Sequence, residues 1–335
     1  CPESIINFKG DFIKEIIKKN YTPIIASSKP DFDIESSLGN SYKIKYKTIF
    51  LKRNGLNIFD DIRTFYEITS IIKKYKPKFI FASGIKLVIW GGISSRICNT
   101  PFFSLITGLG YAFYGGSFYR KCIKKIAISL YKFALKNSKA VIFQNVENKK
   151  VFLKNNLVLN SNSFKVNGSG VNLKKYNLAL LPKTNIRFLC IARLLGEKGL
   201  REYAAAAKVI KKKFNDVEFE LLGPEDPSPD GISKIEVAEW SSYLSYKGKA
   251  NDVRPYIKNC HIFVLPSYHE GLPRSTLEAM ALGRPIITTD AVGCRDTVVN
   301  GENGWLVPPR NVDALAVRMI WFIENPEQWQ KMAAA

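Results

Sequence analysis

Two glutamates beside a predicted helix start are well suited to hold a sugar or a ribose. Glu270 lies in a turn after the apolar run 262–265, and Glu278 lies eight positions later on a predicted helix, 275–282. Eight residues span a little over two helical turns, so both carboxylates can face one side. Carboxylates accept hydrogen bonds from hydroxyl groups but repel phosphates. The spacing therefore favours a site for sugar or ribose hydroxyls, and a capped helix with two solvated acids is the alternative.

Two cations follow another predicted buried strand. Arg193 and Lys198 lie in the loop after the apolar run 187–192. There they could neutralise the diphosphate that a sugar nucleotide releases. The helix start near Pro273 also suits a phosphate, because the free N–H groups of a first helical turn are positively polarised. Taken alone, a loop with two cations is typical of a solvated surface. The cationic loop and the helix that carries Glu278, however, both point to the same cleft.

The elements that would position these residues form an alternating pattern. Short apolar or aromatic runs alternate with longer amphipathic ones, which is typical of βα units around parallel sheets. The strands expected in the first half are 22–26, 46–51, 79–82, 102–106 and 140–144, and the helices are 5–19, 58–75, 86–98 and 118–137. The strands expected in the second half are 187–192, 218–222, 244–247, 262–265, 285–289 and 304–307, and the helices are 199–214, 253–260, 275–282 and 312–324.

The periodicity stops near 164–176, where Asn167-Gly-Ser-Gly170 indicates a hinge. We therefore expect two doubly wound α/β domains, 1–166 and 183–330, joined by a linker over 167–182, with ligands bound at the carboxyl ends of the strands. The chain begins inside a helical pattern and ends soon after another. The first strand and the C-terminal helix are therefore expected to be missing from this chain.

Composition and charge narrow the classes of partner. The chain of 335 residues is 46% hydrophobic, which argues against disorder, and its net charge is +21. Residues 1–170 hold 28 Lys and Arg against 10 Asp and Glu, so nearly all of this charge lies in the first half. Such a field attracts a polyanion, an anionic bilayer or a charged acceptor. The six scattered cysteines predict reduced thiols of a cytosolic protein and no metal site.

One predicted helix concentrates the positive charge. At about 100° per residue, its lysines fall within about 60° of one another, opposite an apolar side. The lysines are Lys121, Lys125, Lys132, Lys136 and Lys139, and the opposing residues are Ile126, Leu130, Phe133 and Ala134. The uncharged stretch 102–119 precedes them and is too broken for a transmembrane helix. The pattern indicates either a surface that lies on an anionic leaflet or an ordinary solvated helix face.

The motifs of the second half resemble a known family. Arg193-x4-Lys198 paired with Glu270-x7-Glu278, each after a predicted strand, looks like the retaining GT-B glycosyltransferases of family 4. Segments 168–172, 222–226, 247–253 and 300–309 support the resemblance, which covers about 5–324. Segment 107–113 is similar to a subset that builds bacterial surface polysaccharides and lipid-linked oligosaccharides, including enzymes that add N-acetylgalactosamine to undecaprenyl-diphosphate-linked sugars.

The resemblance implies a fold and an activity. The fold would be GT-B, with two Rossmann-like domains facing a cleft. The reaction would be retaining transfer of a hexose or N-acetylhexosamine from a nucleotide sugar, expected to be UDP-linked, to a polyprenyl-diphosphate-linked saccharide. It implies no cofactor, metal or protein nucleophile, and no nucleic-acid partner. The enzyme would be cytoplasmic and peripheral on the inner face of the cell membrane, in contact with its anionic surface.

The resemblance also assigns roles to residues. Arg193 and Lys198 would bind the donor diphosphate, Glu270 would contact the transferred sugar and Glu278 would hold the ribose hydroxyls. The donor-binding residues it implies are Gly223, Lys249, Val253, Gly271, Leu272, Pro273, Thr276 and Glu278. The residues expected at the acceptor or membrane are Thr107, Gly108, Gly110, Lys121, Lys125 and Lys132.

One departure from the family pattern leaves alternatives open. Many relatives place a His near the donor sugar in the N-terminal domain, but the two histidines of this chain are His261 and His269. Thr107 or the backbone of 108–110 is expected to fill that space. A sugar-nucleotide 2-epimerase shares the architecture but usually needs more acids and histidines than the first half supplies. A nucleic-acid-binding protein would use the basic half, yet no RRM, KH or helix-turn-helix signature is present.

Overall fold

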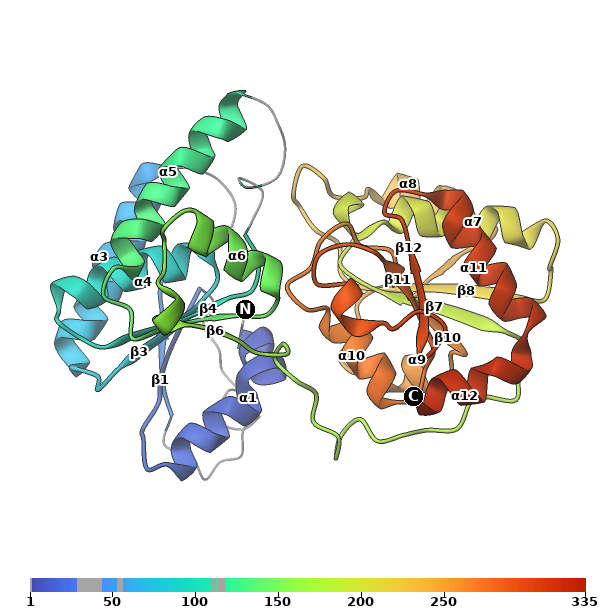
Figure 1. Cartoon of the computed structure of the whole chain (residues 1–335), viewed down its shortest axis with the longest axis horizontal. Coiled ribbons are helices and arrows are strands. Elements are labelled where there is room, and N and C mark those ends of the chain that lie inside the picture. The colour runs from blue at the N-terminus through green and yellow to red at the C-terminus, as the bar shows by residue number, and fades with distance from the viewer. Residues whose placement is uncertain (1, 29–43, 53–56, 110–112, 114–117) are drawn as a thin grey trace. The chain divides into compact units, whose positions relative to one another are not determined.

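The computed structural model describes residues 2–28, 44–52, 57–109, 113 and 118–335, and it divides the chain into two compact units (Figure 1). Unit 1 is Cys1–Ser169 and unit 2 is Gly170–Ala335. Both units are α/β structures with parallel strands, which confirms the fold class expected from the alternating pattern. None of the helices within the described ranges is long and apolar enough to cross a membrane.

Unit 1 contains a four-stranded parallel sheet in the order β3-β4-β5-β6 and a separate parallel pair, β1-β2. Its strands are β1 Ile24–Ser27, β2 Lys45–Thr48, β3 Ile80–Ser83, β4 Phe102–Ile106, β5 Ala140–Phe143 and β6 Ser163–Lys165. Its helices are α1 Pro2–Lys18, α3 Ile58–Tyr75, α4 Ile85–Ile97, α5 Phe118–Leu135, α6 Val146–Lys154 and the 3-10 turn η2 Asn160–Asn162.

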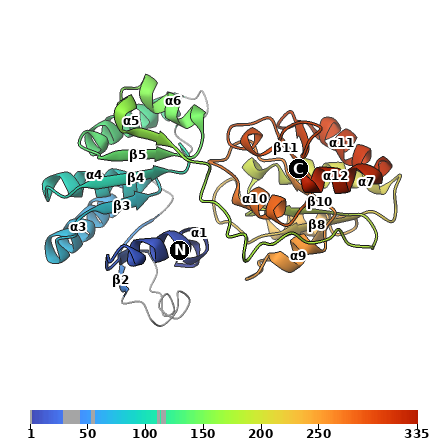
Figure 2. The same cartoon turned by 60° about the horizontal axis from the view of Figure 1, so that its bottom comes forward.

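Helices cover both faces of the unit 1 sheet. α4 packs between α3 and α5. Neighbouring residues of β3 point to opposite faces. Ile80 packs into the core beneath the α3 and α4 side chains, whereas the ring of Phe81 lies 4.9 Å from that of Phe12 on α1. The helices α3 and α1 therefore lie on opposite sides of the sheet (Figure 2).

The predicted lysine helix needs two corrections. α5 ends at Leu135, so Lys136 and Lys139 follow the helix rather than extending its stripe. Ile126 and Phe133, expected to face the core, are 61% and 51% exposed. Around the helix axis, both residues lie about 100° from the centre of the lysine stripe, at the border of the apolar side. Only the side of the helix that carries Tyr131 and Ala134 packs into the core.

Unit 2 contains a six-stranded parallel sheet in the order β12-β11-β10-β7-β8-β9. Its strands are β7 Arg187–Ile191, β8 Glu218–Leu222, β9 Ser245–Tyr246, β10 Ile262–Leu265, β11 Ile286–Thr289 and β12 Gly304–Val307. Its helices are α7 Leu200–Lys211, α8 Lys234–Glu239, α9 Arg254–Lys258, α10 Arg274–Ala281, α11 Val312–Glu324 and α12 Trp329–Ala334. Unit 2 also contains the 3-10 turns η3 Gly196–Lys198, η4 Arg295–Thr297 and η5 Pro326–Gln328, and η3 carries a residue of the site.

The strand order of unit 2 determines where a ligand can bind. Starting at β7, the chain builds outward through β8 and β9, then returns to the other side of β7 and builds outward through β10, β11 and β12. This is the doubly wound order whose direction reverses between its first and fourth strands, here β7 and β10. Sheets of this order bind ligands beyond the carboxyl ends of these two strands, which here end at Ile191 and Leu265. The two motifs predicted from the sequence follow these residues directly.

Candidate donor site

The loops after β7 and β10 meet through an ion pair. The Lys198 ammonium donates a 2.8 Å hydrogen bond to Glu270 Oε1, and the two side chains are only 12% and 19% exposed. Lys198 lies in η3, and Glu270 lies in the turn before α10. The backbone joins the same loops, because the Tyr268 N–H donates to the Glu197 carbonyl at 2.9 Å. The structure thus brings two of the three predicted catalytic residues into direct contact.

Lys198 stays a cation in this surrounding. Burial favours the neutral amine, but the carboxylate and hydrogen bond of Glu270, with the charge of Glu197, outweigh it and raise the pKa of Lys198. The Glu197 carboxylate is 3.7 Å from the ammonium. A positive charge is therefore held at the switch point of the sheet throughout the physiological pH range.

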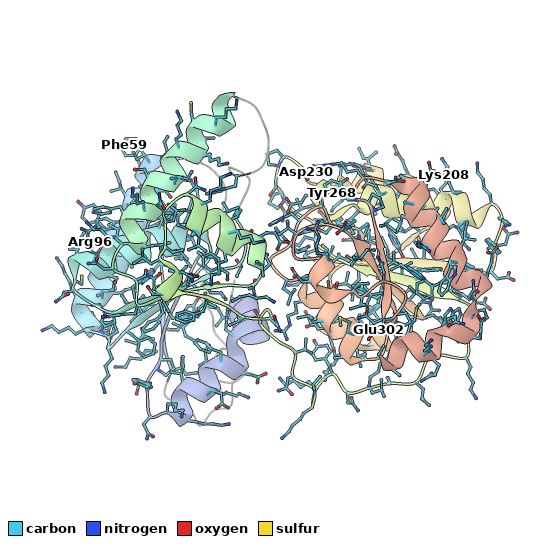
Figure 3. All side chains as sticks on the ribbon, in the orientation of Figure 1. Phe59, Arg96, Lys208, Asp230, Tyr268 and Glu302 are labelled. Atoms are coloured by element: carbon cyan, nitrogen blue, oxygen red, sulfur yellow. The ribbon has the colours of Figure 1, made fainter. Side chains whose placement is uncertain are left out.

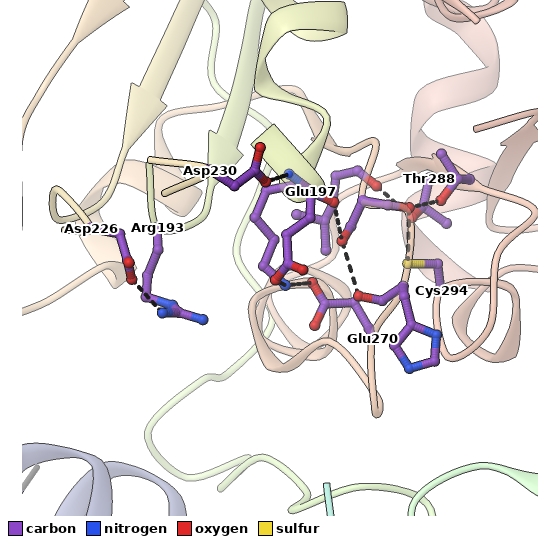
Figure 4. A network of polar contacts seen from close by, with 12 residues as sticks. Arg193, Glu197, Asp226, Asp230, Glu270, Thr288 and Cys294 are labelled. Atoms are coloured by element: carbon purple, nitrogen blue, oxygen red, sulfur yellow. Dashed lines mark hydrogen bonds and ion pairs between the residues drawn. The ribbon is translucent and has the colours of Figure 1, made fainter. Parts of the chain in front are cut away.

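Arg193 has a different partner. Its guanidinium donates to the Asp226 carboxylate, which follows β8, and Arg193 itself is 47% exposed (Figure 4). Burial raises the pKa of Asp226, but hydrogen bonds from Ser228 and the charge of Arg193 outweigh it and lower that pKa. Since one carboxylate does not use all five donors of a guanidinium, Arg193 retains N–H groups for a ligand anion.

Glu278 is held by a residue other than Glu270. Arg274 Nε, one helical turn earlier on α10, donates to Glu278 Oε1 at 2.8 Å, and both side chains are largely buried. Burial, together with the charge of the Glu278 carboxylate, raises the pKa of Tyr176 to about 12, so this half-buried phenol remains protonated. The sequence analysis did not predict a role for Arg274; the i,i+4 spacing of Arg274 and Glu278 is the signal that was available.

The segment from Gly271 to Thr276 forms the start of α10. Pro273 caps the helix without a side-chain hydrogen bond, and Gly271 and Pro273 are buried while Leu272 is half-buried. Thr276 is fully buried, and its hydroxyl has no hydrogen-bond partner within the described ranges. A buried hydroxyl of this kind normally has a partner, so a ligand at the helix start would satisfy it.

The residues expected near a nucleobase surround the end of β8. Gly223 follows β8 with φ +154°, and a Cβ there would lie 1.8 Å from the Ala192 carbonyl oxygen, so only glycine lets the loops after β7 and β8 approach this closely. The Gly223 N–H donates to the Gly248 carbonyl at 2.8 Å, which joins it to the loop holding exposed Lys249 and half-buried Val253. These three predicted residues therefore belong to neighbouring loops.

A further glycine fixes the Glu270 loop, and the sequence gave no reason to single it out. The Glu270 N–H donates to the Val292 carbonyl at 2.9 Å, in the loop after β11. Gly293 has φ +78°, and a Cβ there would lie 2.3 Å from the Glu270 carbonyl oxygen. Three consecutive strands of the sheet, β7, β10 and β11, thus position the Lys198–Glu270 pair.

The two histidines differ in their surroundings. His261 is buried; its Nδ1 accepts from the Arg187 N–H at 3.0 Å and its Nε2 lies 3.1 Å from the Pro182 carbonyl oxygen. Burial lowers its pKa, so His261 is a neutral structural residue of unit 2. His269 is half-buried beside Glu270. Across the described part of the chain, no three His, Cys, Asp or Glu side chains gather closely enough to hold a metal ion.

The residues expected at an acceptor or membrane lie in unit 1. Thr107, directly after β4, is exposed, and nothing lies within 4 Å of a Cβ built on Gly108. Lys121, Lys125 and Lys132 on α5 are exposed. Gly110 falls outside the described residues.

Comparison with known proteins identifies the family. Residues 177–335 match the family model for glycosyl transferases group 1, which covers β7 to α12 and with them all the predicted donor-site residues. The chain is 31% identical over 290 residues to the N,N'-diacetylbacillosaminyl-diphospho-undecaprenol alpha-1,3-N-acetylgalactosaminyltransferase of Campylobacter jejuni, covering 82% of this chain and 75% of the relative. The chain is a group 1 glycosyltransferase. The resemblance predicted from its motifs is confirmed.

This glycosyltransferase is also similar to other bacterial glycosyltransferases. It is 26% identical over 274 residues to the Escherichia coli UDP-Gal:alpha-D-GlcNAc-diphosphoundecaprenol alpha-1,3-galactosyltransferase, which covers 78% of this chain and 70% of the relative. A further match is the Staphylococcus aureus capsular polysaccharide biosynthesis glycosyltransferase CapM, 30% identical over 38% of this chain and 34% of the relative.

Solved structures show the fold of the glycosyltransferase. Sucrose-phosphate synthase from Thermosynechococcus elongatus superposes with a TM-score of 0.74 at 18% identity, over 93% of this chain and 92% of that one. Anabaena HepE in complex with UDP gives a TM-score of 0.71 at 16% identity, over 93% of each chain. Both are GT-B glycosyltransferases, so the GT-B fold expected from the sequence is confirmed.

Proposed function

We propose that this glycosyltransferase moves a hexose or N-acetylhexosamine from a UDP-sugar to a polyprenyl-diphosphate-linked saccharide, with retention at the anomeric carbon. The donor half of the proposal rests on the Lys198–Glu270 pair at the switch point of the unit 2 sheet. The acceptor half rests on two relatives whose names specify undecaprenyl-diphosphate-linked saccharides, one of them with a UDP-sugar donor. The name of CapM, which specifies capsular polysaccharide biosynthesis, supports bacterial glycan biosynthesis as the setting.

The site supplies the chemistry that such a transfer needs. The bond between the anomeric carbon and the diphosphate breaks, negative charge develops on the leaving diphosphate, and the acceptor oxygen bonds to the same face of the sugar. The leaving phosphate takes the acceptor proton. Lys198 and the exposed N–H groups of Arg193 stabilise the developing charge, and the α10 N-terminus with the Thr276 hydroxyl binds the phosphate oxygens. Glu270 accepts from hydroxyls of the transferred sugar, and Glu278 accepts from the ribose.

Binding of nucleotides tests the donor half. UDP or a UDP-sugar at about a hundredfold over its Kd should raise the thermal midpoint by about 5–10 °C, because such saturation stabilises the native state by about 2.7 kcal/mol. Glu278→Ala should abolish the shift, and Glu239→Ala, at an exposed position on α8, should keep it. No shift of the wild-type midpoint with UDP, GDP, ADP or their sugar derivatives would refute the donor assignment. A transfer assay on lipid-linked against free saccharides then tests the acceptor.

A membrane-facing surface on unit 1 completes the proposal. From residue 68 to residue 146 the sequence contains 13 Lys and Arg and no Asp or Glu. Two neighbouring helices in this stretch expose large apolar side chains among the cations: Ile97 on α4 is 58% exposed, and Ile126 and Phe133 on α5 are exposed by more than half. Arg96, labelled on α4 in Figure 3, lies 4.4 Å above the Phe133 ring and joins the two helices. Exposed apolar side chains beside lysines suit the headgroup region of an anionic bilayer.

Binding to lipid vesicles tests whether the surface on α4 and α5 contacts a membrane. Replacing Lys121, Lys125 and Lys132 by glutamate should weaken binding to phosphatidylglycerol vesicles by at least about a hundredfold, because each cation near such a surface contributes about 1 kcal/mol. The matched control replaces Lys208, Lys212 and Lys258 of unit 2 by glutamate, which changes the net charge equally at exposed positions. Equal weakening by the two triple variants would show that net charge alone acts, and would overturn the surface on α4 and α5.

A further inference from the structure

The turn that carries Lys198 is capped from another loop. Leu195 stands at the N-cap position of η3, where a leucine side chain offers no hydrogen-bond acceptor. The Glu197 N–H instead donates to Asp230 Oδ2, 33 positions further along the chain, at 2.7 Å (Figure 4). The Gly196 N–H donates to the carbonyl oxygen of the same aspartate at 2.9 Å. Asp230 therefore satisfies the first two N–H groups of the turn, which the turn itself leaves without partners.

Gly196 lets Asp230 come this close to the turn. A Cβ on Gly196 would lie 2.5 Å from Asp230 Oδ1 and 2.5 Å from Arg201 Nη1, well inside van der Waals contact. Arg201 is itself held by α8, because its Nη2 donates to Glu236 Oε2 at 3.0 Å. The aspartate and the arginine thus both cover the Gly196 backbone, which is buried.

The loop that brings Asp230 to the turn is held in one shape. The Ser228 N–H donates to Asp226 Oδ1 at 3.0 Å, and the Gly231 N–H donates to the Ser228 carbonyl at 2.7 Å. A Cβ on Gly231 would lie 2.3 Å from the Asp226 carbonyl oxygen, so the loop closes tightly on itself. The Asp226 carboxylate at one end pairs with Arg193. The same loop therefore holds one cation of the site by its side chain and the turn of the other by its backbone.

We propose that Asp230 is a positioning residue for the donor diphosphate: as the cap of η3, it fixes the backbone from which Lys198 reaches the diphosphate. The inference rests on the proposed function, because it assumes the role given there to Lys198. Glu270 holds the ammonium end of this side chain, and Asp230 holds the backbone end. Without the cap the turn opens more readily and the backbone shifts. The ammonium then keeps its pair with Glu270 but loses part of its contact with the diphosphate.

Two substitutions at Asp230 separate the cap from the charge. Asp230→Ala and Asp230→Asn both remove one negative charge, but asparagine keeps an oxygen for the Glu197 N–H and caps about as well as aspartate. The probe is whichever of UDP, GDP and ADP binds the wild-type protein most tightly, measured by calorimetry. We expect Asp230→Ala to bind it about fivefold more weakly than Asp230→Asn, a part of the roughly tenfold that one hydrogen bond to a charged group contributes.

Combining each substitution with Lys198→Ala shows whether Asp230 acts through Lys198. Without an ammonium to position, the alanine and asparagine variants should bind the diphosphate within about twofold of one another, because a residue that acts through a partner adds nothing once the partner is gone. A general structural role would preserve the difference between the two variants.

The matched control is Asn300→Ala. Asn300, in the turn before β12 and so at the opposite end of the strands from the site, accepts from the Leu306 N–H at 2.6 Å through its Oδ1. This variant loses an equivalent bond and should bind the diphosphate as the wild-type protein does. Gly196→Ala disturbs the proposed contact from the turn: its methyl group must displace the Asp230 carboxylate, so binding should weaken by about fivefold although the aspartate is present.

Equal affinities of the Asp230→Ala and Asp230→Asn proteins would overturn the inference, and so would a difference that persists in the Lys198→Ala background. If Asp230→Ala does not fold, Gly196→Ala decides, and an unchanged affinity in that variant overturns the inference. If the wild-type protein binds none of the three nucleotides, or if Lys198→Ala binds them as tightly as the wild type, the proposed function fails first and the inference fails with it.

Discussion

Replacing Lys198 by alanine is expected to lower the rate of sugar transfer by about a hundredfold to a thousandfold, the range for removing one preorganised group that stabilises developing charge. Lys198 is the buried cation at the switch point of the sheet, and its pKa is raised by Glu270. The charge on the departing diphosphate grows as the glycosidic bond breaks, so the loss should appear in kcat more than in KM.

A second effect must be separated from the lost cation. Without Lys198, the Glu270 carboxylate keeps its charge near the leaving phosphate and repels it. The double variant Lys198→Ala with Glu270→Gln removes both charges and shows how much of the loss is repulsion. Lys211→Ala on α7 is the matched control, since Lys211 donates only to the Asn215 carbonyl and lies outside the site. A Lys198→Ala enzyme whose kcat stays within threefold of wild type would contradict the role.

Most strands of unit 2 were predictable because they are largely buried apolar runs. The runs 218–222, 262–265 and 304–307 coincide with β8, β10 and β12, and 312–324 coincides with α11. A continuous apolar run between turn residues has few other ways to hide from water. The site motifs follow such strands directly, which is why Arg193, Lys198 and Glu270 could be placed at one sheet edge from spacing alone.

The elements that the sequence did not reveal are short or weakly apolar. β6 was not predicted as a strand, because Ser163, Phe164 and Lys165 present one buried residue and two exposed ones. The helix α6 follows β5 without an apolar run; it begins at an Asn145 cap, whose side chain accepts from the Asn148 N–H at 2.8 Å. α8 and α12, with six residues each, are too short to show a period.

One pairing within the site lay beyond sequence reasoning for a different reason. Spacing predicted that Glu270 and Glu278 both serve a ligand, but not that Lys198 pairs with the first. Lys198 and Glu270 are 72 positions apart along the chain, and only the packing of loops brings them together. The Arg274–Glu278 pair, in contrast, has the i,i+4 spacing that a sequence can show.

Gly293 and Gly301 offer a comparison in which backbone conformation is matched. Both have φ +78° in loops of unit 2, so an alanine side chain costs each about 1–2 kcal/mol for the left-handed backbone alone. They differ in what a Cβ would meet. At Gly301 the nearest atoms belong to the Trp305 ring at 3.5 Å, an ordinary contact, whereas at Gly293 the Glu270 and Gly271 carbonyl oxygens lie at 2.3 and 2.6 Å.

Gly293→Ala is therefore expected to lower kcat by about a hundredfold, because it must push the Glu270–Gly271 backbone aside, and a 1 Å displacement of a reacting group costs about that much. Gly301→Ala should lower the thermal midpoint by about 2–8 °C and keep its activity, since its strain is the same but no site residue moves. Transfer rates and melting curves of the two variants decide the matter. Equal loss of activity in both would mean that strain in the unit, rather than the position of Glu270, limits transfer; a Gly293→Ala enzyme with full activity would mean that the Glu270 loop tolerates displacement.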